Sequence, residues 1–159
     1  MKQDIISLFE FSGKEIEKLI DDAIKIKKSP KKYFGKLNGK TLAMLFQKTS
    51  TRTRVSFEVG MAQLGGHAIF LDWRTTNFTL GSLEDEIKTL SRYCDAIMFR
   101  AYKNSDVVSA ANAATVPFIN GLDDLYHPCQ ILADLMTMKE KKGKLKGIKV
   151  AFVGDGNNV

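Results

Sequence analysis

Residues 49–54 of this chain read Thr49-Ser50-Thr51-Arg52-Thr53-Arg54. An apolar run at 42–46 precedes them and is typical of a buried strand, and a helix-compatible stretch follows at 55–64. Four hydroxyl and two guanidinium side chains are therefore concentrated where a strand passes into a helix. This junction predicts an α/β arrangement, and the rest of the chain can be interpreted outward from it.

The start of the predicted helix has the composition of an anion-binding site. The first turn of a helix leaves backbone N–H groups unpaired and carries the positive end of the helix dipole, so phosphate binds there readily. Ser50 is the expected N-cap, which places Arg52 and Thr53 in the first turn. Arginine offers a planar fork that matches phosphate oxygens. The alternative is a capped helix with solvated arginines, and no Gly-x-x-x-x-Gly-Lys phosphate loop is present.

Size and composition favour a globular protein with an anionic ligand. The chain has 159 residues, 44% of them hydrophobic, which suits about one domain with a real core. The formal charge of +6 suits anions. Lysine clusters at 25–28 and 139–146 lack interleaved aromatic residues and match no nucleic-acid-binding motif, so nucleic acid is not an expected partner.

Cysteine usage and hydropathy exclude several other classes. Cys94 and Cys129 do not form a disulfide framework, and neither belongs to a Cys-x-x-Cys pair, so we expect no metal site. The first residues lack the layout of a signal peptide, and no apolar stretch approaches membrane-spanning length. We therefore expect a cytoplasmic protein that does not bind membranes.

Strands and helices alternate along the whole chain. This alternation predicts an α/β fold with an open parallel sheet of about four strands, helices on both faces, and the first strand of a second α/β domain. Pro117 moves its strand towards a sheet edge or a strand start. The predicted strands lie at 41–46, 67–71, 96–100, 116–120 and 149–153. The predicted helices lie at 13–29, 50–64, 82–93, 106–114 and 127–141.

Three separate parts of the sequence follow strands and carry polar groups. They are residues 50–54, Arg100, and His127 with Gln130. Ligands of open parallel sheets bind beyond the carboxyl ends of the strands, so these groups converge on one edge. A histidine at a helix N-terminus tends to stay neutral and can polarise a carbonyl group. The alternative for His127 is a simple helix cap, and Cys129 is expected to be a buried apolar thiol.

Three motifs give the chain a family resemblance. Residues 46–54 (Phe-Gln-Lys-Thr-Ser-Thr-Arg-Thr-Arg), 99–102 (Phe-Arg-Ala-Tyr) and 120–134 (Asn-Gly-Leu-Asp-Asp-Leu-Tyr-His-Pro-Cys-Gln-Ile-Leu-Ala-Asp) resemble the aspartate/ornithine carbamoyltransferase family. The His-Pro-Cys-Gln form, followed by Val-Gly-Asp-Gly-Asn-Asn at 153–158, is similar to the ornithine branch in particular. The resemblance covers nearly the whole chain.

The resemblance implies two α/β domains and a transfer reaction. Residues 1–146 would be the carbamoyl phosphate-binding domain, and 147–159 the truncated start of the ornithine-binding domain. The carbamoyl group would pass from carbamoyl phosphate to the δ-amine of L-ornithine, giving citrulline and phosphate, in a cytoplasmic homotrimer without metal or cofactor. Alternatives are another acceptor, such as aspartate or putrescine, or a non-catalytic phosphate-binding module.

The resemblance also implies roles for single residues. Arg100 would bridge phosphate and carbonyl oxygen, His127 would donate to the carbonyl oxygen, and Gln130 would hold the carbamoyl NH₂ group. Asn158 would contact ornithine. The residues that would hold the phosphate are Ser50, Thr51, Arg52 and Thr53, and the groups that would stabilise developing charge are Arg52, Arg100 and His127.

Two further expectations concern residues beside this set. Arg54 would be structural, because Glu58 lies four residues on and an intrahelical pair can form. In the family, the loop before the third helix supplies a residue to a neighbouring subunit. Here the loop at 75–82 is shortened and Glu86 replaces a threonine of the family, so Asn77 is the remaining candidate.

Overall fold

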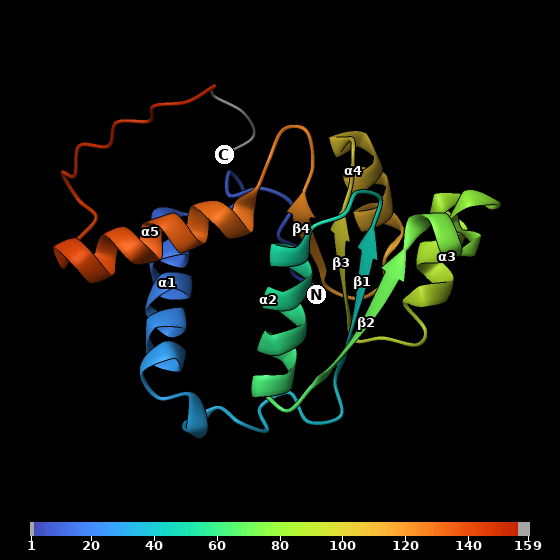
Figure 1. Cartoon of the computed structure of the whole chain (residues 1–159), viewed down its shortest axis with the longest axis horizontal. Coiled ribbons are helices and arrows are strands. Elements are labelled where there is room, and N and C mark those ends of the chain that lie inside the picture. The colour runs from blue at the N-terminus through green and yellow to red at the C-terminus, as the bar shows by residue number, and fades with distance from the viewer. Residues whose placement is uncertain (1, 156–159) are drawn as a thin grey trace.

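The computed structural model describes residues 2–155 and contains one four-stranded sheet, in which all neighbouring strands are parallel (Figure 1). The strand order is β2-β1-β3-β4. The strands are β1 (Thr41–Phe46), β2 (His67–Asp72), β3 (Ala96–Arg100) and β4 (Phe118–Leu122). The helices are α1 (Gly13–Lys28), α2 (Thr51–Gln63), α3 (Leu83–Leu90), α4 (Asn104–Ala113) and α5 (Pro128–Lys142). The predicted α/β class and parallel sheet are confirmed.

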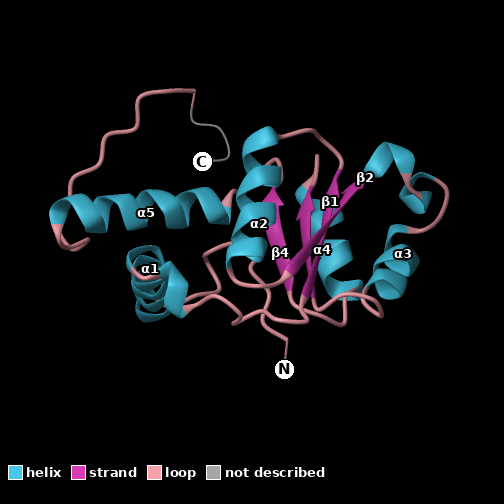
Figure 2. Ribbon diagram, turned by 60° about the horizontal axis from the view of Figure 1, so that its bottom comes forward, coloured by secondary structure: helices cyan, strands magenta, loops and turns pink. Residues whose placement is uncertain are grey.

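Side chains of the central strands alternate between two cores. Ala43 and Leu45 of β1 pack in the cluster that includes residues of α3 and α4, whereas Leu42 and Met44 pack with side chains of α2. Successive side chains of a strand point to opposite faces, so a strand buried on both sides reads as one apolar run. Figure 2 shows α2 on one face of the sheet and α3 and α4 on the other. Helices on both faces are thus confirmed.

Local sequence fixes most helix ends. Ser12 caps α1 in a complete capping box, with its hydroxyl accepting from the Glu15 N–H and the Glu15 carboxylate accepting from the Ser12 N–H. Ser82 caps α3 through the Asp85 N–H. Gly65 follows the end of α2 with a φ of 83°, a left-handed conformation that suits glycine. These ends agree with the predictions.

The fourth strand lies two residues later than predicted. It spans Phe118–Leu122 instead of 116–120, and it forms one edge of the sheet. Pro117 has no N–H to donate and contributes only its carbonyl, which accepts from the Ile97 N–H at 3.0 Å. The predicted edge position is confirmed. Beyond this edge, Ile5 forms an isolated parallel bridge with Ile119.

The predicted strand at 149–153 is wrong. These residues have no regular secondary structure and follow α5 as an exposed segment. A strand needs the N–H and C=O groups of a neighbour, and within residues 2–155 no strand lies beside this segment. The predicted sites Asn157 and Asn158 lie outside the described residues.

Candidate functional site

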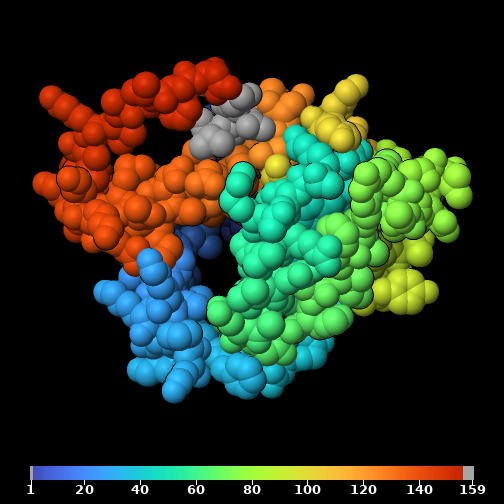
Figure 3. All heavy atoms as spheres, in the orientation of Figure 1, coloured from blue at the N-terminus to red at the C-terminus, as the bar shows by residue number. Residues whose placement is uncertain are grey.

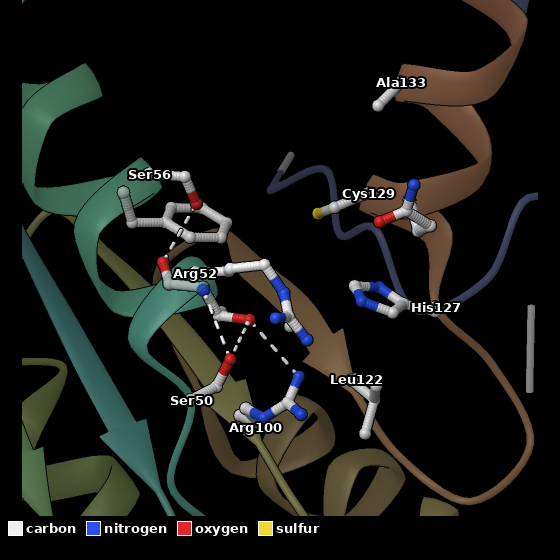
Figure 4. A pocket seen from close by; sticks show the side chains of 12 residues that line it. Ser50, Arg52, Ser56, Arg100, Leu122, His127, Cys129 and Ala133 are labelled. Atoms are coloured by element: carbon white, nitrogen blue, oxygen red, sulfur yellow. Dashed lines mark hydrogen bonds between the residues drawn. The ribbon is translucent and has the colours of Figure 1, made fainter.

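A cavity of about 640 Å³ lies at the carboxyl ends of the strands, between the starts of α2 and α5. The surface is hollowed between these two helices (Figure 3). Figure 4 shows side chains from α2, β3 and the start of α5 around one space. The residues that line the cavity are Ser50, Arg52, Thr53, Ser56, Phe57, Arg100, Gly121, Leu122, His127, Cys129, Gln130 and Ala133. The predicted convergence of three sequence segments is therefore what the fold produces.

The start of α2 is capped as predicted. Ser50 is extended (φ −163°, ψ 111°), and its hydroxyl accepts from the Thr53 N–H at 3.3 Å. The same hydroxyl donates to Thr53 Oγ1 at 3.1 Å. The N–H groups of Thr51 and Arg52 lie in the first turn, where a helix offers no backbone acceptor. Thr51 does not line the cavity, so its predicted phosphate contact stays a prediction.

Arg100 reaches the start of α2 from the neighbouring strand. Its Nη1 donates to Thr53 Oγ1 at 3.2 Å, while its buried Nε has no hydrogen-bond partner within residues 2–155. Burial, and then the positive charge of Arg52, lower the pKa of Arg100. Neither guanidinium forms an ion pair with a carboxylate in the described part of the chain. Two adjacent, uncompensated cations attract a multiply charged anion.

His127 faces the two guanidiniums from the start of α5 (Figure 4). It is the N-cap residue by position, but its side chain makes no capping bond. Its buried Nδ1 lacks a partner among residues 2–155. Burial is the largest cause that lowers the pKa of His127, and the charge of Arg100 is the next. The imidazole is therefore neutral near pH 7, as predicted, and the alternative that it is a simple helix cap is wrong.

Gln130 lies one turn along α5 and is held by Asp134. Its Nε2 donates to Asp134 Oδ1 at 3.0 Å. An ionised carboxylate only accepts hydrogen bonds, so this contact assigns the orientation of the Gln130 amide. The amide oxygen of Gln130 is then available to accept from an N–H group in the cavity. This geometry suits a ligand with an NH₂ group beside a carbonyl oxygen.

Comparison with known proteins identifies the family. The profile described as "Aspartate/ornithine carbamoyltransferase, carbamoyl-P binding domain" matches residues 3–140. The chain belongs to this family. It is 52% identical to "Ornithine carbamoyltransferase" of Bacillus subtilis, over 99% of this chain and 49% of that protein. It is also 52% identical to "Ornithine carbamoyltransferase, anabolic" of Pyrococcus furiosus, over 99% of this chain and 51% of that protein.

Solved structures of family members have the same fold. The Pyrococcus furiosus ornithine carbamoyltransferase superposes with a TM-score of 0.94 at 52% identity, covering 99% of this chain and 51% of that one. The Thermus thermophilus ornithine carbamoyltransferase superposes with a TM-score of 0.93 at 41% identity, covering 100% of this chain and 55% of that one. This carbamoyltransferase-family chain thus spans about half the length of the relatives it matches.

Several residues of the carbamoyltransferase-family site were not identified from the sequence. Gly121 lines the cavity because a Cβ there would lie 2.4 Å from Met98 Sδ, so only glycine fits without displacement. Lys48 lies over the Tyr102 ring at 5.7 Å, and burial followed by the charge of Arg100 lowers its pKa. Lys48 belongs to the same conserved-looking run of polar residues as Ser50, which was the available signal.

Other predictions about neighbouring residues are confirmed. Burial raises the pKa of the Cys129 thiol to about 11, so this thiol is inert near neutral pH. Arg54 Nε donates to Glu58 at 2.9 Å, and its guanidinium lies 3.9 Å from the centroid of the Phe70 ring. Arg54 therefore ties α2 to β2 instead of lining the cavity. Among residues 2–155, no helix has the length and apolarity needed to cross a membrane.

Proposed function

We propose that this chain is the carbamoyl phosphate-binding half of an ornithine carbamoyltransferase. In this proposal residues 1–146 form the carbamoyl phosphate-binding domain, and residues 147–159 begin the amino-acid-binding domain. Family membership and the printed names of the relatives support the reaction, since several are called ornithine carbamoyltransferase at about 50% identity. The acceptor site then belongs to the half of those relatives that this chain does not match.

One observation carries the proposal. The unpaired guanidiniums of Arg52 and Arg100 and the neutral imidazole of His127, with its unpartnered Nδ1, line a single cavity. In the proposed complex, the phosphate lies against Arg52 and the start of α2, where Ser50, Thr51 and Thr53 supply hydroxyl and N–H donors. The cavity's other end offers a hydrogen-bond donor for a carbonyl oxygen and an acceptor for an NH₂ group.

The proposed roles at that other end follow from donor and acceptor chemistry. Arg100 bridges the phosphate and the carbonyl oxygen because it already bonds Thr53 at the start of α2. His127 donates an N–H to the carbonyl oxygen, and a neutral imidazole can do this without adding charge. Gln130 accepts from the carbamoyl NH₂ group through its amide oxygen.

The proposed reaction needs no covalent enzyme intermediate. The neutral δ-amine of ornithine attacks the carbonyl carbon, a C–N bond forms, the C–O bond to phosphate breaks, and one amine proton is released. Negative charge grows first on the carbonyl oxygen and then on the leaving phosphate. Arg52, Arg100 and His127 stabilise that charge, and loss of one such preorganised donor typically costs about 10²–10³ in rate.

Calorimetry with this chain tests the binding part of the proposal. We expect carbamoyl phosphate to bind more tightly than inorganic phosphate, because only the former has groups for His127 and Gln130. Equal affinities would favour the second candidate, a simple phosphate-binding module, which the hydroxyl and guanidinium groups at the start of α2 would also support. Absence of binding to either ligand would contradict both.

Turnover tests the acceptor part of the proposal. We expect this chain with carbamoyl phosphate and ornithine to give no citrulline above background, because the acceptor must be held in near-attack geometry by the other half of the enzyme. A longer version that spans the full length of the relatives should give citrulline, and aspartate or putrescine in place of ornithine should not. Citrulline from this chain alone would show that the acceptor site is misplaced.

The biological setting is part of the same proposal. The name of the Pyrococcus furiosus relative, which includes "anabolic", supports a role in arginine biosynthesis. A cytoplasmic location and assembly of the whole enzyme into trimers follow from the family resemblance and stay predictions. The contribution of Asn77 to a neighbouring subunit and the contact of Asn158 with ornithine also stay predictions. Light scattering of the full-length enzyme checks the trimer.

A further inference from the structure

A buried carboxylate organises the loop that leads into His127. Asp123 is fully buried, and no role in the proposed reaction requires it. Its Oδ1 accepts from the N–H groups of Leu125 at 2.7 Å and Tyr126 at 2.6 Å. Its own N–H donates to the Tyr126 carbonyl at 3.1 Å. The backbone is thereby closed into a turn that ends one residue before His127.

The other oxygen of the same carboxylate holds two different segments. Asp123 Oδ2 accepts from Asn120 Nδ2 at 2.8 Å and from Asn104 Nδ2 at 2.7 Å. Asn120 is fully buried in β4, and Asn104 is the first residue of α4, four residues after Arg100. The carboxylate thus joins the end of β4, the loop before α5 and the segment that follows Arg100.

Asn120 carries the same network to the end of the sheet. Its Nδ2 also donates to the Ile6 carbonyl at 2.9 Å, and its Oδ1 accepts from the Leu122 N–H at 3.0 Å. At this point the pairing of β3 and β4 shifts register, so that Leu122 lies opposite Arg100. The network therefore bears on the backbone of both ligand-facing strand ends.

We propose that Asp123 is a positioning residue, whose carboxylate holds His127 where it can reach the carbonyl end of a ligand bound through its phosphate at α2. The inference rests on the proposed function for the identity of that ligand. The phosphate end does not depend on Asp123, because Ser50 and Thr53 are bonded to each other and lie on a different loop. Loss of the carboxylate should therefore impair one end of the site and spare the other.

Asp123→Asn tests this separation with a side chain of the same shape. An amide has one acceptor oxygen and one donor nitrogen, so it cannot accept from all four N–H donors. We expect the affinity for carbamoyl phosphate to fall about tenfold, the effect of roughly one lost hydrogen bond to a charged group. The affinity for inorganic phosphate should change less than about twofold. A general structural defect would weaken both ligands together, and equal losses would overturn the proposal.

Asp124→Asn is the matched control. This exposed neighbour accepts only the Asn104 N–H, at 2.6 Å, and touches neither Leu125 nor Tyr126. We expect Asp124→Asn to leave the ratio of the two affinities unchanged. A fall in carbamoyl phosphate affinity equal to that of Asp123→Asn would contradict a specific role for the buried carboxylate.

A ligand-free measurement separates this inference from the proposed function. The chain has two histidines, at 67 and 127, so an NMR titration of His127 can be assigned. Burial is the largest cause of its lowered pKa; Arg100 and Lys48 lower it further, while Asp134 and Asp123 raise it. If Asp123 holds the ring in place, Asp123→Asn releases it to solvent and its pKa rises towards that of free imidazole. An unchanged or lower pKa would overturn the proposal whether or not carbamoyl phosphate binds.

Asn104→Ala decides the matter if Asp123→Asn does not fold. It removes one of the four donors and leaves the turn at 123–126 intact. We expect a loss in the same direction, about two- to threefold for carbamoyl phosphate and none for inorganic phosphate. No change in that ratio for Asn104→Ala, in a chain that binds carbamoyl phosphate, would count against the network.

Discussion

The starts of α2 and α5 face each other across one cavity, yet they are built in different ways. At α2, Ser50 caps the helix and bonds Thr53, three residues away. At α5, the N-cap residue His127 makes no capping bond, and its loop is held by Asp123 together with a side chain from α4. The first site is local in sequence, whereas the second depends on contacts between distant segments.

This difference separates two physical tasks. The α2 start must present charge and N–H donors, which a short motif at a helix terminus can do alone. The α5 start must keep an uncharged imidazole buried and aimed, with no bond to its Nδ1. A side chain without its own partner can only be held by the backbone that carries it, and that backbone is fixed from elsewhere.

Arg52→Ala is expected to break the α2 side most severely. It removes a guanidinium without an ion-pair partner from the first turn of α2. Hydrogen bonds to charged groups are worth about 1.5–3 kcal/mol, so a bidentate phosphate contact predicts a loss of about 10²-fold in affinity. Calorimetry with inorganic phosphate and carbamoyl phosphate measures it, and both ligands should weaken equally.

Arg54→Ala is the control for the loss of positive charge. Arg54 lies two residues on but bonds Glu58 and stacks on Phe70 instead of lining the cavity. Phosphate affinity should fall only severalfold at low salt, through long-range charge alone. Equal losses for Arg52→Ala and Arg54→Ala would mean that net charge, and not the helix start, binds the anion.

The local side of the comparison was largely predictable. The strand at 41–46, the Ser50 cap and the Arg54–Glu58 pair each depend on residues within a few positions, and each is confirmed. The sheet order and the convergence of Arg100 and His127 followed from the rule that parallel strands end at one edge.

What the sequence did not reveal depends on distant partners. The Asp123 network needs Asn104 and Asn120, 19 and 3 residues away, and no local pattern announces it. The apolar run at 149–153 reads as a strand, but strand formation requires a neighbouring strand that residues 2–155 do not provide. The requirement for glycine at position 121 comes from Met98 on the adjacent strand.

Ser50→Ala sharpens the comparison at the level of the cap. Loss of an N-cap hydroxyl typically destabilises a protein by about 1 kcal/mol, and here it also removes a cavity-lining hydroxyl. Ser12→Ala removes the corresponding cap of α1, and Ser12 does not line the cavity. Urea unfolding should show similar losses of stability for both variants, while only Ser50→Ala weakens phosphate binding. Weaker phosphate binding in Ser12→Ala would show that the loss follows from stability.

Asp134→Asn sharpens the comparison at the α5 side. An asparagine can donate to the Gln130 oxygen, which permits the Gln130 amide to turn its NH₂ group into the cavity. Acetyl phosphate, which carries a methyl group where carbamoyl phosphate carries NH₂, should then be rejected less strongly. The Gln130–Asp134 pair is exposed, so we expect the ratio of the two affinities to fall only about twofold. Gln130→Leu is the control, because it cannot discriminate through an amide, and an unchanged ratio in Asp134→Asn would contradict the assigned orientation.

The smallest expected effect is a pH dependence that belongs to the α5 side alone. Folding lowers the pKa of His127, so between its ordinary value of about 6.5 and its lower folded value the unfolded chain binds more protons than the folded one. The free energy of unfolding therefore decreases as pH falls below about 6.5. His127→Gln removes this contribution, while His67 remains in both chains and cancels in the comparison. Urea unfolding at pH 7.5 and pH 5 should show a larger loss of stability in the unmodified chain than in His127→Gln. Arg52→Ala should keep the pH dependence of the unmodified chain, because a guanidinium does not titrate in this range. Identical pH dependence in the unmodified chain and His127→Gln would mean that the imidazole is not held in a buried, neutral state, and the contrast between the two helix starts would fail.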